Sequence, residues 1–243
     1  MIQPLRIPYG ADASQFGELY LPQETTRGVV VVIHGGFWRD AYDYTLGTPL
    51  AQSLVASGWA AWNVEYRRVG NGGGEPATFD DLADGIDKLG ELDLDLSTVV
   101  TLGHSAGGHL AAWAASRGRF ARWGDGVDVT HVISQAGVLD LVAGHASALG
   151  DGAVKRFLGH VPGVSDAAVD PLQQLPLAQP LWCVHGTEDT IVPISQSETY
   201  VDAATAAGAR AELVSIEGGD HFAVIDPSST AWARTLGILD TIA

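Results

Sequence analysis

Short apolar runs rich in β-branched residues alternate along the chain with longer Ala-rich segments whose apolar residues recur at helical spacing. This alternation is typical of a mainly parallel sheet with helices on both faces, so we expect an α/β fold of about eight strands. The runs expected to form strands are 5–9, 17–21, 28–33, 59–65, 98–102, 129–134, 181–185 and 211–216. The segments expected to form helices are 48–57, 79–89, 106–117, 195–207 and 230–242.

Capping residues and glycines indicate where these segments end. Thr78 is expected to cap the helix that begins at residue 79, and Gly208 to close the helix that ends at residue 207. Residues 69–76 contain four glycines and are expected to form a surface loop. Residues 141–179 contain several prolines and no clean periodicity, which favours either a small lid insertion over the carboxyl edge of the sheet or an ordinary helix and loop.

Length and charge narrow the class of protein. A chain of 243 residues favours one domain over residues 1–243. It carries 13 Lys and Arg residues against 29 Asp and Glu residues, and the formal net charge of −16 disfavours nucleic acid and membranes as partners.

The single cysteine, Cys183, lies in an apolar run and is expected to be a buried thiol. No signal peptide or membrane span is recognisable, so a cytoplasmic location is expected. The oligomeric state stays open.

The sequence G-H-S-A-G at residues 103–107 places Ser105 between an expected strand and an expected helix. In this setting a serine sits on a sharp turn at the sheet edge, with its hydroxyl facing a cleft and a helix N-terminus behind it. Because 30 glycines make the pattern alone common, the strand–turn–helix context carries the interpretation. We therefore expect Ser105 to be a nucleophile and not an incidental residue of a glycine-rich turn.

A glycine pair in the sequence H-G-G-F-W, at residues 34–38, directly follows another expected strand. Unobstructed backbone N–H groups can stabilise the negative charge of a tetrahedral intermediate. We expect Gly36 and Phe37 to supply two such groups of an oxyanion hole, and Ala106, next to the nucleophile, to supply a third. His34 is expected to hydrogen-bond within this loop and hold its shape, and not to act as the base.

The base and the acid are expected beyond the last two strands, because catalytic groups gather at the carboxyl edge of a parallel sheet. His221 follows the last strand and Asp189 follows the strand before it. The chain order Ser–Asp–His is that of α/β-hydrolases. His221 would take the proton of the serine, and Asp189 would orient the ring. Glu188 and Asp220 are the alternatives for the acid.

The remaining histidines and the nearby aromatic residues are given other roles. His104 and His109 flank the serine but are expected to point away from it. The other histidines are expected to be satisfied strand residues or solvated residues of segment 141–179; they are His131, His185, His145 and His160. Four aromatic residues are candidates for a substrate pocket, although aromatic side chains are often simply core: Phe37, Trp38, Tyr66 and Phe222. No metal-binding motif occurs, so no metal and no cofactor is expected.

Together these motifs resemble those of α/β-hydrolases, in particular the small esterase and kynurenine-formamidase-like group. The matching segments are 34–38 (H-G-G-F-W), 65–68 (E-Y-R-R), 103–108 (G-H-S-A-G-G), 185–193 (H-G-T-E-D-T-I-V-P) and 220–222 (D-H-F). The resemblance implies the α/β-hydrolase fold and the same three catalytic residues. Hormone-sensitive-lipase-like esterases usually have a third glycine where Phe37 stands, whereas the H-G-G-x-W loop is similar to that of formamidase-like and small feruloyl-esterase-like members.

The leading hypothesis is a serine hydrolase that cleaves a small acyl or aryl carboxylic ester through an acyl-serine intermediate. The first alternative is an arylformamidase that acts on N-formylkynurenine-like formanilides, since acyl transfer from nitrogen passes through the same kind of intermediate. The second is a non-catalytic α/β-hydrolase-fold protein that binds a small molecule. The expected partner is accordingly a small-molecule ester or amide substrate.

Overall fold

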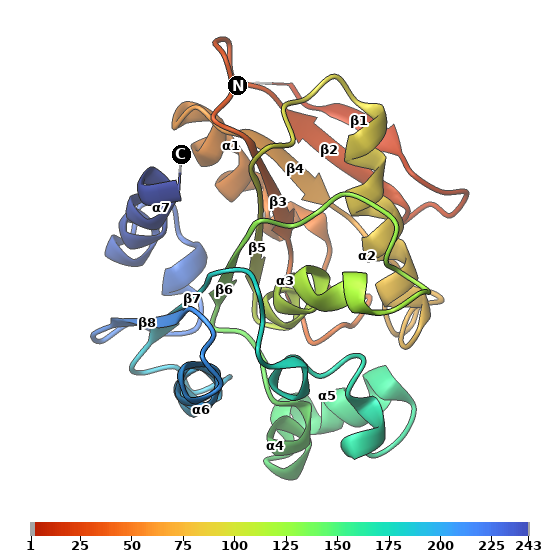
Figure 1. The fold of residues 1–243 in the computed structure, drawn as a ribbon, viewed down its shortest axis with the longest axis vertical. Helices are drawn as coiled ribbons and strands as arrows, with labels where there is room; N and C mark the ends of the chain where they lie inside the picture. The colour runs from red at the N-terminus through yellow and green to blue at the C-terminus, as the bar shows by residue number, and fades with distance from the viewer. Residues whose placement is uncertain (1–2, 243) are drawn as a thin grey trace.

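The computed structural model describes residues 3–242, which form an eight-stranded sheet between layers of helices (Figure 1). The strands are β1 (Leu5–Pro8), β2 (Phe16–Tyr20), β3 (Val29–Ile33), β4 (Ala60–Val64), β5 (Val99–His104), β6 (His131–Gln135), β7 (Leu181–Gly186) and β8 (Ala211–Ile216). Their order is β1-β2-β4-β3-β5-β6-β7-β8. Pairs β1–β2 and β2–β4 are antiparallel and all others are parallel. The expected strand number and mainly parallel sheet are confirmed.

The helices follow the strands as the sequence pattern predicts. They are α1 (Thr48–Ala56), α2 (Ala77–Asp87), α3 (Ala106–Ser116), α4 (Leu141–Ala146), α5 (Leu149–Leu158), α6 (Ser195–Ala206) and α7 (Thr230–Ile242). Helices α1 and α7 cover one face of the sheet, and α2, α3 and α6 cover the other (Figure 1). Within residues 3–242, no helix has both the length and the apolar composition to cross a membrane. The predicted domain also includes residues 1, 2 and 243, which lie outside the described part.

Strand β3 shows why some apolar runs are unbroken. All of its residues are buried, and successive side chains point to opposite faces of the sheet. Val31 and Ile33 belong to the core that contains α2 and α3, whereas Val30 and Val32 belong to the core that contains α1 and α7. A strand covered on both faces must be apolar throughout, so the sequence shows no polar alternation here.

The predicted helix cap at Thr78 is wrong. Helix α2 begins at Ala77, with Pro76 in the cap position. The Thr78 hydroxyl instead donates to the carbonyl oxygen of Arg67 at 2.7 Å and accepts from the amide of Gly74 at 3.0 Å. Thr78 therefore fastens the glycine-rich loop to the residues that follow β4, a tertiary role that a capping rule does not consider.

Segment 141–179 forms α4, α5 and two short 3₁₀ turns, Val164–Asp166 and Pro171–Gln174. It contacts the loop that follows β3. The ring of Phe157 stacks on that of Trp38 at a centroid distance of 4.7 Å, and Arg39 donates to the carbonyl oxygen of Gly150. These contacts place the segment beside the candidate oxyanion loop.

Candidate active site

Ser105 occupies the sharp turn between β5 and α3, with φ of 57° and ψ of −118°. A positive φ is costly for a residue with a side chain and persists only where the surroundings enforce it. Here the backbones nearly touch: a Cβ on Gly103 would lie 1.9 Å from the carbonyl oxygen of Gly107. A Cβ on Gly107 would lie 2.1 Å from the carbonyl oxygen of Ile33. Glycine at both positions is therefore needed for the turn that carries Ser105.

The structure brings His221 and Asp189 together from loops that follow β8 and β7. His221 Nδ1 donates to Asp189 Oδ2 at 2.6 Å, and the amides of Ile191 and Val192 donate to Oδ1 at 2.8 and 2.9 Å. Burial works against the charge of Asp189, but hydrogen bonds from His185 and His221 outweigh it and hold the pKa of Asp189 well below its usual value. The carboxylate therefore stays charged beside the imidazole.

The two alternative acids lie elsewhere. Glu188 is exposed, and Asp220 accepts hydrogen bonds from the amides of the two residues after His221. Among the described residues, Asp189 is the only carboxylate that contacts the ring of His221. The geometry therefore favours Asp189 over both alternatives as the residue that orients the imidazole.

His104 connects the turn of Ser105 with the loop of His221. Within residues 3–242, no hydrogen bond joins Ser105 Oγ to His221. His104 Nε2 donates to the carbonyl oxygen of His221 at 2.9 Å, and the two rings lie 4.5 Å apart, a contact that the sequence analysis does not predict. Burial lowers the pKa of His104 to about 3, so its ring is neutral. His104 thus fastens the loop of the candidate base to the serine turn.

The alternation of side chains along β5 could have predicted the direction of His104. Leu102 belongs to the core beneath α1 and α7, and residues two apart in a strand point to the same face. His104 therefore faces the side of the sheet from which the loop before α7 approaches.

The candidate oxyanion loop is pressed against the serine turn. A Cβ on Gly35 would lie 2.6 Å from the carbonyl oxygen of His104, so only glycine permits this approach. The next three residues, Gly36, Phe37 and Trp38, have φ of 111°, 56° and 54°. Two of these are not glycine, and such strain concentrates at functional sites. The backbone here is therefore held in a conformation that the chain would not adopt by itself.

The direction of the candidate oxyanion amides is set by the carbonyl groups of the same peptides. His34 Nδ1 donates to the carbonyl oxygen of Gly35 at 2.8 Å, and the amide of Arg39 donates to that of Gly36 at 3.0 Å. In a planar trans peptide the C=O and N–H groups point in opposite directions. Fixing these two oxygens therefore fixes the N–H groups of Gly36 and Phe37. The contacts of His34 match its expected role in shaping the loop.

A buried network of hydrogen bonds and ion pairs holds His34 in place. Tyr66 donates to the carbonyl oxygen of His34 at 2.6 Å and stacks on its ring at 4.4 Å. Glu65 accepts from Arg68 and lies 3.2 Å from His34 Nε2, and the amide of Tyr44 donates to it at 3.0 Å. Burial raises the pKa of Tyr66 far above its usual value, so its hydroxyl remains a donor. Segment 65–68 is thus the support of the oxyanion loop.

Two of the residues expected to line a substrate pocket are instead fully buried. Trp38 and Tyr66 have no exposed surface, because Trp38 stacks on Phe157 and Tyr66 on His34. Neither can contact a substrate in this conformation. Phe222, which is 54% exposed and lies edge-on to His221, has free surface beside the site. Of the expected pocket residues, Phe222 and the half-buried Phe37 remain available to a substrate.

Potential ligand positions also lie away from Ser105. Within residues 3–242, one trio of side chains presents metal-ligand atoms within 4.8 Å of one another: Glu75, His160 and Asp166. His160 Nε2 lies 2.7 Å from Asp166 Oδ1, and the amide of Gly163 donates to Oδ2 at 2.7 Å. These hydrogen bonds already engage the ligand atoms of His160 and Asp166.

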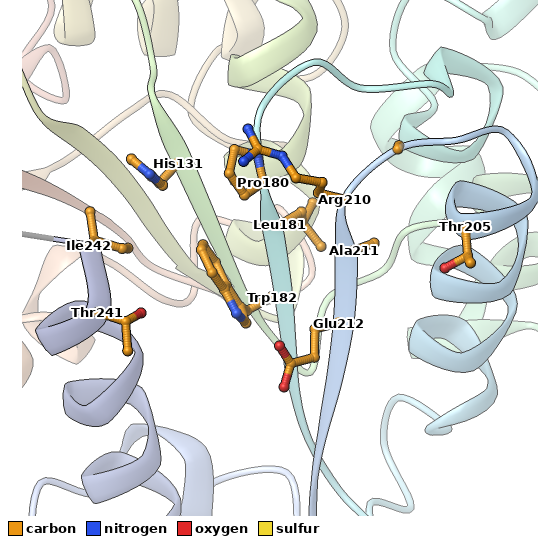
Figure 2. Close-up of a pocket in the computed structure, with 11 residues that line it drawn as sticks. His131, Pro180, Leu181, Trp182, Thr205, Arg210, Ala211, Glu212, Thr241 and Ile242 are labelled. Atoms are coloured by element: carbon orange, nitrogen blue, oxygen red, sulfur yellow. The ribbon is translucent and has the colours of Figure 1, made fainter.

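A hollow of about 530 Å³ lies at the start of β6, β7 and β8. Figure 2 shows His131, Trp182 and Arg210 among its lining residues, next to the end of α7. Because these strands are parallel, their beginnings lie at the edge of the sheet opposite to Ser105. The hollow is therefore separate from the candidate active site.

The sheet topology, the serine turn and the Asp–His pair define the chain as an α/β-hydrolase. More specifically, the chain belongs to the BD-FAE family, whose model matches residues 18–203. The match includes Ser105 and Asp189, whereas His221 lies beyond it.

Similar proteins carry esterase names. The chain is 26% identical over 241 residues to the probable isoprenylcysteine alpha-carbonyl methylesterase ICME of Oryza sativa subsp. japonica, covering 88% of this chain and 56% of the relative. It is 24% identical over 251 residues to esterase LipC of Mycobacterium tuberculosis, covering 93% and 61%. The chain thus spans little more than half the length of these relatives.

Solved structures share the fold. Esterase B from Lactobacillus rhamnosis, solved with a tributyrin phosphonate inhibitor, matches with a TM-score of 0.85 at 21% identity, covering 99% of this chain and 84% of that one. A thermophilic esterase, Est2 of Thermogutta terrifontis, matches with a TM-score of 0.79 at 24% identity, covering 98% and 90%.

Proposed function

We propose that the chain is a serine hydrolase that cleaves a small carboxylic ester through an acyl-serine intermediate. The observation that carries the proposal is the 2.6 Å hydrogen bond between His221 and Asp189, at the same sheet edge as the strained Ser105. A base oriented by a charged carboxylate, next to a serine on a sharp turn, is the arrangement that activates a hydroxyl.

The reaction follows from these positions. His221 Nε2 takes the proton of Ser105 as Oγ attacks the acyl carbon, and Asp189 stabilises the resulting imidazolium. The amides of Gly36, Phe37 and Ala106 donate to the oxyanion. Collapse of the intermediate expels the alcohol, which receives the proton from His221, and leaves an acyl-serine. A water molecule, deprotonated by His221, then attacks the acyl carbon. When this second intermediate collapses, His221 returns the proton to Ser105 Oγ and the carboxylic acid is released.

The names of similar proteins support an ester with a small acyl or alkyl group. The two sequence relatives are named as a methylesterase and an esterase, and the Thermogutta esterase was solved with butyrate and with propionate. Ser105 is only 2% exposed, which supports a small acyl group at the nucleophile. Phe222 at the rim is free to contact the alcohol or aryl part of the substrate.

The test is hydrolysis of p-nitrophenyl acetate and butyrate by the wild-type chain and by Ser105→Ala. The serine variant should lose about 10⁴-fold or more in kcat, because the acyl-serine intermediate cannot form without the hydroxyl. Equal and negligible rates for both proteins would remove the proposal. Labelling of Ser105 by a fluorophosphonate separates a catalytic chain from a non-catalytic binding protein.

An arylformamidase is the alternative to an esterase. Formanilide hydrolysis would use the same residues, and the ratio of kcat/KM for a formanilide and a phenyl ester decides between the two bonds. We also propose that segment 141–179 acts as a small lid. The contact of Phe157 with Trp38 and that of Arg39 with Gly150 support its position beside the oxyanion loop. A cytoplasmic location stays a prediction from the sequence.

A further inference from the structure

A second imidazole, that of His185, lies beside the carboxylate of Asp189. His185 is fully buried at the end of β7, and its Nε2 lies 3.3 Å from Asp189 Oδ2 and 2.9 Å from the carbonyl oxygen of Val192. Its Nδ1 lies 2.7 Å from the hydroxyl of Ser197, which is buried on α6. The sequence interpretation treated His185 as a satisfied strand residue and did not connect it with the acid.

The surroundings fix which nitrogen of His185 carries the proton. Both groups that face Nε2 are acceptors, so Nε2 must be protonated and shared between Val192 and Asp189. Nδ1 is then unprotonated and accepts from Ser197. The proton of Nε2 is therefore directed at Val192 and Asp189, and Asp189 Oδ2 also accepts the hydrogen bond from His221.

We propose that His185 is a positioning residue that fixes the carboxylate of Asp189 for His221. Two backbone amides hold Oδ1, and the two imidazoles hold Oδ2, so the carboxylate has donors on both oxygens. Loss of the His185 donor leaves Oδ2 dependent on His221 alone. The inference deepens the proposed function and rests on it.

The contact between His185 and Asp189 is expected to affect the rate of the reaction. A carboxylate that rotates lets the imidazole rotate with it, and misplacement of a base by a fraction of an ångström lowers the rate of proton transfer. Substrate binding does not use Asp189. A positioning role therefore predicts a loss in kcat with little change in KM.

Two amide variants of His185 distinguish the loss of its hydrogen-bond donor from a change in packing. In His185→Gln the side-chain nitrogen reaches the position of Nε2, next to Asp189; in His185→Asn it reaches only that of Nδ1, next to Ser197. With p-nitrophenyl acetate and the full chain, we expect His185→Gln to keep kcat within about threefold, and His185→Asn to lose roughly 10- to 100-fold, with KM within about twofold for both. Equal losses in the two variants would overturn the proposal.

A matched control and a spectroscopic readout complete the test. Ser197→Ala removes the bond on the far side of His185 but leaves both acceptors at Nε2, so kcat should stay within about twofold. A loss equal to that of His185→Asn would assign the effect to packing and overturn the proposal. The strongly deshielded proton of His221 Nδ1, followed by proton NMR, should persist in His185→Gln and disappear by exchange in His185→Asn.

The NMR signal also tests the proposal if a variant does not fold or if the chain has no esterase activity. If His185→Asn does not fold, absence of the deshielded proton in folded His185→Gln still overturns the proposal. If wild-type and Ser105→Ala chains are equally inactive, the proposed function fails, whereas the NMR comparison still reports whether His185 holds the Asp189–His221 bond.

Discussion

The two sides of the candidate site are built differently. The oxyanion loop, residues 34–38, rests on a buried network in which Glu65, Tyr66 and Arg68 all reach His34 or its immediate partners. On the other side, His104 and Asp189 hold the buried His221, but the adjacent Phe222 is 54% exposed. The oxyanion side is therefore supported by a buried ion pair, whereas the base side combines a buried imidazole with an exposed neighbour.

The difference corresponds to what each side does in the proposed reaction. Oxyanion donors are effective when they are fixed before the charge develops, since they then need no rearrangement. His221 must instead exchange a proton with Ser105, the leaving group and water in turn. We therefore expect changes on the oxyanion side to lower stability and activity together, and changes on the base side to lower activity far more than stability.

Asp189→Asn should give the largest effect and test the base side. The asparagine oxygen can still accept from Ile191 and Val192, but the amide group would face His221 Nδ1 with a donor and favour the wrong tautomer. We expect kcat for p-nitrophenyl acetate to fall by about 10⁴-fold, with a loss of about 1–3 kcal/mol of stability because the buried N–H groups lose a charged acceptor. Glu188→Gln, one residue away and exposed, should stay within about twofold. Equal losses in these two variants would contradict the assignment.

The same contrast explains what could be predicted from the sequence. Ser105 and its glycines are recognisable because the turn itself demands them, and the strands are recognisable because burial on both faces demands apolar runs. The supporting roles of Tyr66 and His185 could not be read in this way. Each depends on where a side chain meets a loop that is distant in the sequence, and no local pattern records that meeting.

Glu65→Gln should give the next largest effect and test the oxyanion side. It removes the buried charge opposite Arg68 and weakens the hold on His34, so we expect about 3 kcal/mol less stability and a fall in kcat of roughly 10- to 100-fold. Asp81→Asn is the matched control, because Asp81 is a buried partner of Arg67 in a second ion pair. Urea unfolding should show similar losses for both, while activity falls mainly in Glu65→Gln.

Acid should destabilise the fold through one histidine on each side. Burial lowers the pKa of His104 to about 3 and that of His109, packed edge-on against Trp38, to about 4. Below pH 6.5 the unfolded chain therefore binds protons that the folded chain does not, and stability falls as the pH falls toward these values. Each group should contribute about 1.4 kcal/mol per pH unit within that window.

Urea unfolding at pH 7 and pH 5 checks this contribution. His109→Gln and His104→Gln should each reduce the loss of stability between these two pH values, since each removes one group that titrates only when unfolded. Only His104→Gln should also lower kcat, because His104 holds the loop of His221. Losses as large as that of the wild-type chain in both variants would show that other groups govern the acid limb.

The smallest effect should come from one hydroxyl beneath the oxyanion loop. Tyr66 donates to the carbonyl oxygen of His34 at 2.6 Å, whereas Tyr9 donates to the carbonyl oxygen of Glu65 at 2.5 Å. Tyr66→Phe and Tyr9→Phe therefore remove the same kind of bond at neighbouring points, and each should cost about 1 kcal/mol of stability. Only Tyr66→Phe frees the residue that fixes the Gly35 carbonyl, so it alone should lower kcat, by roughly three- to tenfold, with KM unchanged. If the two variants lose kcat equally, the network supports the sheet and not the orientation of the oxyanion amides.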